Sequence, residues 1–209
     1  MKSTLEKALF KQFKDIGRDI FLRGLISSHA GNMSTRTGDK IHITRRTSML
    51  GHLKPADIIE LDLEKNDPNL LPMASSEVPV HKAIYKNTSA LAIIHTHPPY
   101  ATLLSMIEND LIPLDLEGSY YLKKVPVVAL NKTIGSEEAA SIVSEHLKDY
   151  KVVLVRGHGS FARGDMLEEA YMLTSSLEAS SFFLYHLKHI TASFPMARLC
   201  HLDKKDTKL

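Results

Sequence analysis

Two histidines at the end of a short apolar run are the first residues of this chain that could do chemistry. The run Leu91–Ile94 is followed by His95, by His97 two residues later, and then by two prolines. Such a run is typical of a buried strand, and the prolines end it because proline has no N–H group for a ladder. Successive strand side chains alternate faces, so His95 and His97 point the same way. Two imidazoles on one face could share a metal ion, although a His-x-His pair is more often two satisfied polar side chains.

A second apolar run that leads to a histidine strengthens the metal hypothesis. Lys151–Val155 is typical of a buried strand, and His158 follows it with a glycine on each side. The glycines indicate an unusual backbone conformation or a close approach at a strand end, where functional residues often lie. Three imidazoles would leave one coordination position open for water or substrate, as in catalytic zinc sites.

Two other segments could bind an anion. Ser27–Ser34 contains small residues and Gly31, which indicate a turn before a strand. The N–H groups of that turn could form an anion nest, or the segment could be a plain loop. Ser75 and Ser76 are candidate N-caps of a helix over 75–85, whose N-terminus could hold a phosphate.

Two ionisable residues at the start of that helix have ordinary interpretations when they are considered alone. Glu77 is a favourable acid in the first turn of a helix. His81 follows one turn later and is more simply a solvated or core histidine than a ligand. This segment by itself therefore gives neither residue a catalytic role.

The elements that must position these groups follow from apolar periodicity and capping patterns. Caps are expected at Ser3 with Glu6, at Ser136, and at Asp165 with Glu168. The predicted helices cover 3–25, 75–85, 100–107, 136–148 and 165–190, and the predicted single strands cover 58–62, 91–97, 125–130 and 151–155.

An early hairpin decides the kind of sheet. Thr35–Arg45 alternates apolar and polar residues around a Gly38-Asp39 turn, which requires antiparallel pairing. Strands and helices otherwise interleave, so we expect a mixed sheet covered by helices. Leu111–Tyr121 is predicted to be irregular and could line a site or a subunit contact.

Length and composition predict one globular domain over 1–195 and a charged, loose tail over 196–209. The net charge of +2, with both signs interspersed, gives no electrostatic case for nucleic acid. No apolar run is long enough to cross a membrane, and the charged N-terminus does not resemble a signal peptide. The single cysteine, Cys200, fits a reducing compartment, so a cytoplasmic protein is expected.

Four separated stretches together resemble the class II aldolase/adducin family, and most of all its L-fuculose-phosphate aldolase branch. Their order and spacing agree with that family over nearly the whole chain. The resemblance implies an α/β/α domain with a mixed, largely antiparallel sheet, assembled as a homotetramer with sites at subunit junctions. The stretches are Ala30–Ser34, Ser75–Glu77, His95–His97 and Gly157–Gly159.

The resemblance also implies roles for individual residues. It implies Zn²⁺, or another divalent cation such as Mn²⁺, Co²⁺ or Fe²⁺, held by His95, His97 and His158. Glu77 would be a further ligand at rest and an acid/base when substrate binds. Contacts to a phosphorylated substrate would come from Gly31, Asn32, Ser75 and Ser76.

The chain departs from the family pattern where the substrate would lie. A Thr/Ser-Gly pair is usual after the second hairpin strand, but this chain has Arg45–Ser48, of which Arg46 could supply a contact of its own. His29 stands where a Thr or Ser phosphate contact is common. The general-acid tyrosine of the aldolases has no clear counterpart, and the candidates near its position are Glu117, Tyr120 and Tyr121.

The expected function is that of a metal-dependent aldehyde-lyase, which cleaves or forms a C–C bond in a phosphorylated ketose to give dihydroxyacetone phosphate and an aldehyde. The alternatives on the same scaffold are a sugar-phosphate 4-epimerase, a dehydratase and a decarboxylase. These differ in the acid/base on the far side of the substrate. An adducin-like interaction domain is disfavoured because Glu77 and all three histidines are retained.

Overall fold

An eight-stranded sheet with helices on both faces forms the centre of the computed structural model, which describes residues 4–132 and 135–193. The strands are β1 (Asn32–Thr37), β2 (Lys40–Thr44), β3 (Ile58–Asp62), β4 (Ala92–Thr96), β5 (Asp110–Leu111), β6 (Val125–Val128), β7 (Val152–Val155) and β8 (Gly159–Gly164). Their order is β3-β2-β1-β4-β8-β7-β6-β5, and only β6 and β7 pair in parallel. The predicted mixed, largely antiparallel sheet is confirmed.

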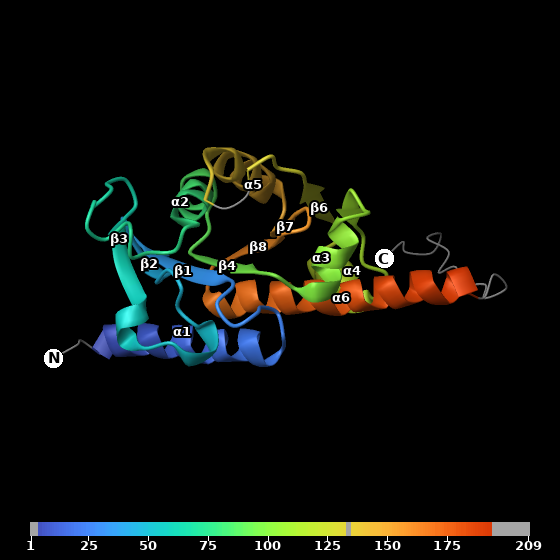
Figure 1. The fold of residues 1–209 in the computed structure, drawn as a ribbon, viewed down its shortest axis with the longest axis horizontal. Helices are drawn as coiled ribbons and strands as arrows, with labels where there is room; N and C mark the ends of the chain where they lie inside the picture. The colour runs from blue at the N-terminus through green and yellow to red at the C-terminus, as the bar shows by residue number, and fades with distance from the viewer. Residues whose placement is uncertain (1–3, 133–134, 194–209) are drawn as a thin grey trace, which may run out of the picture.

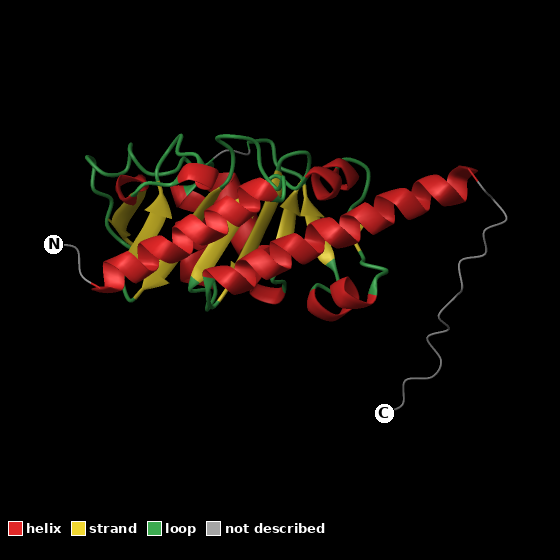
Figure 2. Ribbon diagram, turned by 90° about the horizontal axis from the view of Figure 1, so that it is seen from below, coloured by secondary structure: helices red, strands yellow, loops and turns green. Residues whose placement is uncertain are grey.

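Helices cover the sheet on both sides, which gives the expected three-layer α/β/α domain (Figure 1). They are α1 (Thr4–Leu22), α2 (Val78–Asn87), α3 (Pro99–Ser105), α4 (Leu116–Tyr121), α5 (Glu137–Asp149) and α6 (Leu167–Ser193). Two short 3₁₀ helices cover Leu50–His52 and Pro55–Asp57. Helices α2 and α5 pack on one face, whereas α1, α3 and α6 lie on the other, where α1 and α6 cross the strands (Figure 2).

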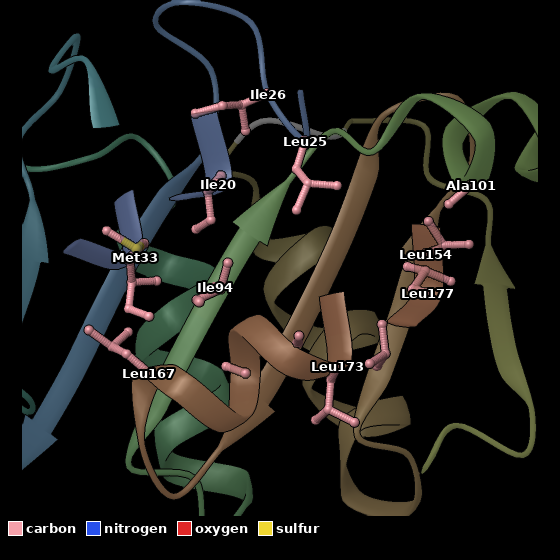
Figure 3. Close-up of a cluster of buried hydrophobic side chains, with 14 of the residues drawn as sticks. Ile20, Leu25, Ile26, Met33, Ile94, Ala101, Leu154, Leu167, Leu173 and Leu177 are labelled. Carbon is pink, nitrogen blue, oxygen red and sulfur yellow. The ribbon is translucent and has the colours of Figure 1, made fainter. Parts of the chain in front are cut away.

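Strands β4 and β7 are buried at every position because both of their faces are covered. In β4, Ile94 packs toward α1 and α6, whereas its neighbour Ile93 belongs to the cluster under α2 and α5. Figure 3 shows the cluster under α1 and α6, in which Ile94 of β4 and Leu154 of β7 lie near Leu173 of α6. The two cores hold β4 from both sides, and they hold with it the end of the strand that carries His95.

Two predicted helix starts are wrong in detail. Helix α2 begins at Val78, with Glu77 rather than a serine at the N-cap, because the Ser75 hydroxyl accepts from the Glu77 N–H group (3.2 Å) and keeps this segment in a turn. At the start of α6, the carboxylate that folds back is that of Glu169, not Glu168. It accepts from the Asp165 N–H group at 2.6 Å.

The structure contains elements that the sequence patterns did not predict. Strand β8 has the composition Gly-Ser-Phe-Ala-Arg-Gly, which lacks a β-branched run, yet it pairs with both β4 and β7. The segment predicted to be irregular contains β5 and α4, and Asp115 caps α4 by accepting from the Gly118 N–H group at 2.7 Å.

The first helix ends earlier than predicted, at Leu22, because Gly24 takes a left-handed conformation (φ 69°) and the chain turns there. The expected cap at Ser3, Cys200 and the tail over 196–209 lie outside the described residues. None of the helices that the structure describes is long and apolar enough to cross a membrane.

Candidate metal centre

Three imidazoles converge where β4 ends beside the turn that joins β7 to β8. His95 is in β4, His97 directly follows that strand, and His158 lies in the turn, which is adjacent because β8 pairs with β4. The potential ligand atoms of the three residues all lie within 4.8 Å of one another. The Nε2 atoms of His95 and His97 are 3.0 Å apart. The structure thus brings together the histidines that the sequence proposed.

The turn that carries His158 is held by its backbone and by α3. Gly157 has a left-handed conformation (φ 66°), and a Cβ atom on Gly159 would lie 2.2 Å from the Thr96 carbonyl oxygen. The Arg156 guanidinium donates to the Ser105 carbonyl oxygen at 2.7 Å, and the Gly157 N–H group donates to the Ser105 hydroxyl at 2.9 Å. The glycines therefore permit the close approach of β8 and β4, and α3 anchors the loop.

The three rings have the protonation that metal binding requires. The Nδ1–H group of His95 donates to the Ser160 carbonyl oxygen (2.9 Å), so the lone pair of this ring is on Nε2, which faces the other two histidines. Burial lowers the pKa of His97 to about 4, helped by the nearby His158, and burial with both neighbouring imidazoles holds the pKa of His95 well below its usual range. Burial also lowers the pKa of His158, so the imidazoles are neutral at pH 7. The buried Nδ1 atom of His158 has no hydrogen-bond partner among the residues that the structure describes. This donor set fits a divalent ion such as Zn²⁺ with an open position.

A cavity of about 190 Å³ opens beside the three imidazoles. This cavity is also lined by residues before and at the start of β1, after β2 and before α2. The sequence proposed them for substrate, phosphate or acid/base roles. They are His29, Gly31, Asn32, Arg46, Ser75, Ser76 and Glu77. Residues from three separate segments therefore share one space with the histidines.

Glu77 is a buried acid at the edge of the cavity. Its side chain is 3% exposed, and its Oε2 atom accepts from the Gly135 N–H group at 3.1 Å. Burial raises the pKa of Glu77 to about 7, against the opposing effect of that hydrogen bond. The carboxyl group can therefore both hold and release a proton near neutral pH. It is not one of the atoms that cluster within 4.8 Å, so its ligand role stays a prediction.

The wall formed after β2 is basic. Arg45 and Arg46 line the cavity with Thr47 and Ser48, and Glu77 is the only acid among the described lining residues. Thr47 has a left-handed backbone (φ 61°), which is uncommon for a β-branched residue and keeps the tight turn that a glycine would form. Arg45, Thr47 and Ser48 were not predicted to be site residues, and their only signal was the departure of this turn from the Thr/Ser-Gly pair that is usual in the family.

The candidates for a general acid lie elsewhere in the chain. Glu117, Tyr120 and Tyr121 belong to α4, and Glu117 lines a different hollow, with Arg23 and Ser176. Tyr120 is 75% exposed. Within one chain the structure does not bring these residues to the histidines.

The fold and the cavity together define the class of protein. The chain belongs to the family described as the class II aldolase and adducin N-terminal domain, whose model matches residues 11–183.

Individual members of the family that are similar to this chain include aldolases and a dehydratase. The chain is 36% identical to an L-fuculose phosphate aldolase of Methanocaldococcus jannaschii over 80% of this chain and 91% of that protein. It superposes on the crystal structure of the L-fuculose-1-phosphate aldolase of Thermus thermophilus with a TM-score of 0.85 and 40% identity, over 88% of this chain and 96% of that one. It is also 31% identical to a methylthioribulose-1-phosphate dehydratase of Acidiphilium cryptum, over 78% of this chain and 83% of that protein.

Proposed function

We propose that this protein is a divalent-metal-dependent aldehyde-lyase that cleaves or forms a C–C bond in a phosphorylated ketose, with dihydroxyacetone phosphate as one partner. The observation that carries the proposal is a single cavity that combines three neutral imidazoles, a buried carboxyl group with a pKa near 7, and a basic wall. The similarity to fuculose phosphate aldolases supports the choice of substrate class.

The chain supplies each part of an aldol reaction. His95, His97 and His158 would hold the ion, which would supply Lewis-acid stabilisation of negative charge on the ketone oxygen. Glu77 moves the proton at the carbon that becomes the nucleophile, because its pKa near neutrality suits both directions of transfer. Its burial keeps water from competing for that proton.

The phosphate of the substrate would lie between the basic wall and the start of α2. Ser75 and Ser76 precede that helix, whose N-terminus favours anions, and Asn32 faces the cavity from β1. Arg46 adds a positive charge from the basic wall, which lies beside Ser75 because the Arg46 N–H group donates to the Met73 carbonyl oxygen at 2.9 Å. It would replace the contact that the family usually makes at this turn.

The proton donor on the far side would come from a second subunit. Apolar side chains are exposed on α3, on the segment after it and on α6, an arrangement that supports assembly into the homotetramer implied by the resemblance. In that assembly Glu117, Tyr120 or Tyr121 would reach the cavity of a neighbouring subunit. The protein would act in the cytoplasm on a small-molecule substrate.

A dehydratase of the methylthioribulose-phosphate type is the second candidate, because one relative carries that name and the basic turn of this chain departs from the aldolase pattern. It would use the same ion and the same carboxyl group. The two reactions differ in the bond that breaks, so their products separate them.

The test is product analysis on zinc-loaded protein with a panel of phosphorylated ketoses that includes fuculose 1-phosphate and methylthioribulose 1-phosphate. We expect dihydroxyacetone phosphate and an aldehyde, identified by mass and chirality, and no turnover with chelator. Loss of water without any aldehyde would favour the dehydratase. Turnover that survives complete metal removal would contradict both.

A further inference from the structure

Four polar side chains are buried in a line between β1 and α2. Asn32 and Ser34 project from β1, and His81 and Tyr85 project from α2, one helical turn apart. All four are at most 6% exposed. Buried polar groups persist in proteins when they are hydrogen-bonded, so each of the four needs a partner inside the protein.

The contacts form one continuous chain of short hydrogen bonds. The Tyr85 hydroxyl lies 2.7 Å from the Ser34 Oγ atom, which lies 2.6 Å from the His81 Nδ1 atom. The His81 Nε2 atom lies 2.6 Å from the Oδ1 atom of Asn32. An amide oxygen can only accept, so the Nε2–H group of His81 must donate to it.

That single constraint fixes every proton in the line. Because burial lowers the pKa of His81 to about 3, its ring carries one proton, which is on Nε2. The Nδ1 atom therefore accepts from the Ser34 hydroxyl, and the Ser34 oxygen in turn accepts from the Tyr85 hydroxyl. Each hydrogen bond in the line therefore has its donor on the Tyr85 side and its acceptor on the Asn32 side.

The line ends at the cavity. Asn32 lines it, and in the strand register Asn32 is the direct partner of His95. The oxygen of the Asn32 amide is tied to His81, and no other described residue accepts a hydrogen bond from its Nδ2 atom. The two N–H bonds of that amide are left for whatever occupies the cavity.

We propose that His81 is a positioning residue: with Ser34 and Tyr85 behind it, it holds the Asn32 amide so that the NH₂ group faces the cavity and donates to an anionic oxygen of the substrate. The proposal rests on the proposed function in one respect, namely that the anion is the phosphate of a sugar phosphate. Without His81, the Asn32 amide can rotate or present its oxygen, which would repel an anion.

The experiment measures inorganic phosphate and dihydroxyacetone phosphate binding to the zinc-loaded full chain by calorimetry. A hydrogen bond to a charged group is a strong one, so Asn32→Ala is expected to weaken phosphate binding by about 10-fold or more. His81→Leu should weaken it by about 10-fold while zinc content stays unchanged. His81→Gln, which can donate to Asn32 and accept from Ser34, should restore most of the affinity.

The double variant separates positioning from a general loss of stability. His81→Leu should have no further effect on phosphate binding in an Asn32→Ala background, because it acts only through that amide. Ser144→Ala is the matched control. It removes a buried hydroxyl of α5 that accepts a hydrogen bond from the Asn87 amide at 2.9 Å. It should lower stability without changing phosphate affinity.

Two results would overturn the proposal. One is wild-type phosphate affinity in folded His81→Leu protein. The other is an equal loss on His81→Leu with and without Asn32, which would mean that His81 acts by another route. If His81→Leu does not fold, Ser34→Ala tests the same line from the side of His81 that faces away from Asn32, with the same expected dependence on Asn32. If wild-type protein turns over a sugar phosphate but binds no phosphate, the anion assignment fails and the C–C chemistry stands.

Discussion

Glu77 is almost completely buried. Among the described residues, its carboxylate accepts one hydrogen bond, from the Gly135 N–H group. A carboxylate in that position loses more hydration than one hydrogen bond returns, so the protonated form is favoured. The same property that would suit the residue to the proposed proton transfer therefore costs the folded protein stability when the group ionises.

That cost predicts a pH dependence. The pKa of Glu77 rises from the ordinary 4.5 to about 7, so its contribution to stability is full below about pH 4.5 and is lost as pH rises through 7. Glu77→Gln cannot ionise and avoids the loss. Between pH 4.5 and pH 8, metal-free Glu77→Gln should gain about 3 kcal/mol in free energy of unfolding relative to wild type, as measured by urea denaturation. A difference that does not change with pH would show that the carboxyl group is well solvated.

The same substitution separates proton transfer from metal binding. Glu77→Gln keeps the size of the side chain and all three imidazoles, so zinc content by elemental analysis should stay near one ion per chain. Turnover should fall by about 10²–10⁴-fold, the usual contribution of a positioned acid or base. Unchanged turnover would remove Glu77 from the mechanism, and loss of the zinc would instead identify it as an essential ligand.

At the scale of elements, helix α3 follows the histidine strand and depends on α6 for its start. Glu178 of α6 accepts from the N–H groups of Tyr100 and Ala101 at 2.9 and 3.0 Å, and thereby caps α3 from outside. The other end of α3 holds the His158 turn through Ser105 and Arg156. Helix α3 thus links two of the segments that carry the imidazoles.

Removing this cap should loosen both segments. Glu178→Ala leaves two N–H groups of α3 unpaired and is expected to lower the free energy of unfolding by about 1–3 kcal/mol. Glu168→Ala, on the exposed side of the same helix, is the matched control and should be close to neutral. Chemical denaturation checks both, and equal effects would mean that the cap has no energetic role.

Sequence patterns predicted those parts of this architecture that depend on local order. Ile93 and Ile94 indicate β4, and Ser136 caps α5 as expected, by accepting from the Ala139 N–H group at 3.0 Å. Strand β8 was not predicted, because its strand conformation comes from two neighbours rather than from its own residues.

The residues of the candidate site also include some that the sequence could predict and some that it could not. The three histidines could be found because each lies beside a recognisable strand. The line from Tyr85 to Asn32 could not be found, since its members are brought together only when α2 packs on β1. His81 looked like an ordinary core or solvated histidine, and burial alone does not reveal what its two nitrogens contact.

For the whole molecule, the proposed metal binding would be coupled to folding, because the imidazoles converge only in the folded sheet. Free Zn²⁺ at about 100 times its dissociation constant should add about 2.7 kcal/mol to the free energy of unfolding. At about 2–4 °C per kcal/mol for a chain of this size, thermal unfolding should shift upward by roughly 5–11 °C.

The measurement is calorimetry with and without zinc, and chelator should reverse the shift. His158→Ala should lose it. His146→Ala, whose ring bonds to its own helix through the Ile142 carbonyl oxygen, should keep it. A shift that persists in His158→Ala would place the ion elsewhere.

The pairing of β4 with β8 has one more consequence. His95 and His97 precede α5 in the chain, and His158 follows it, so a cut between β6 and α5 would leave each fragment with only part of the donor set. Neither fragment could bind the ion firmly. Firm binding would return only when the two fragments reassociate through the pairing of β4 with β8. Binding of the ion would therefore report the reassembly of the split protein.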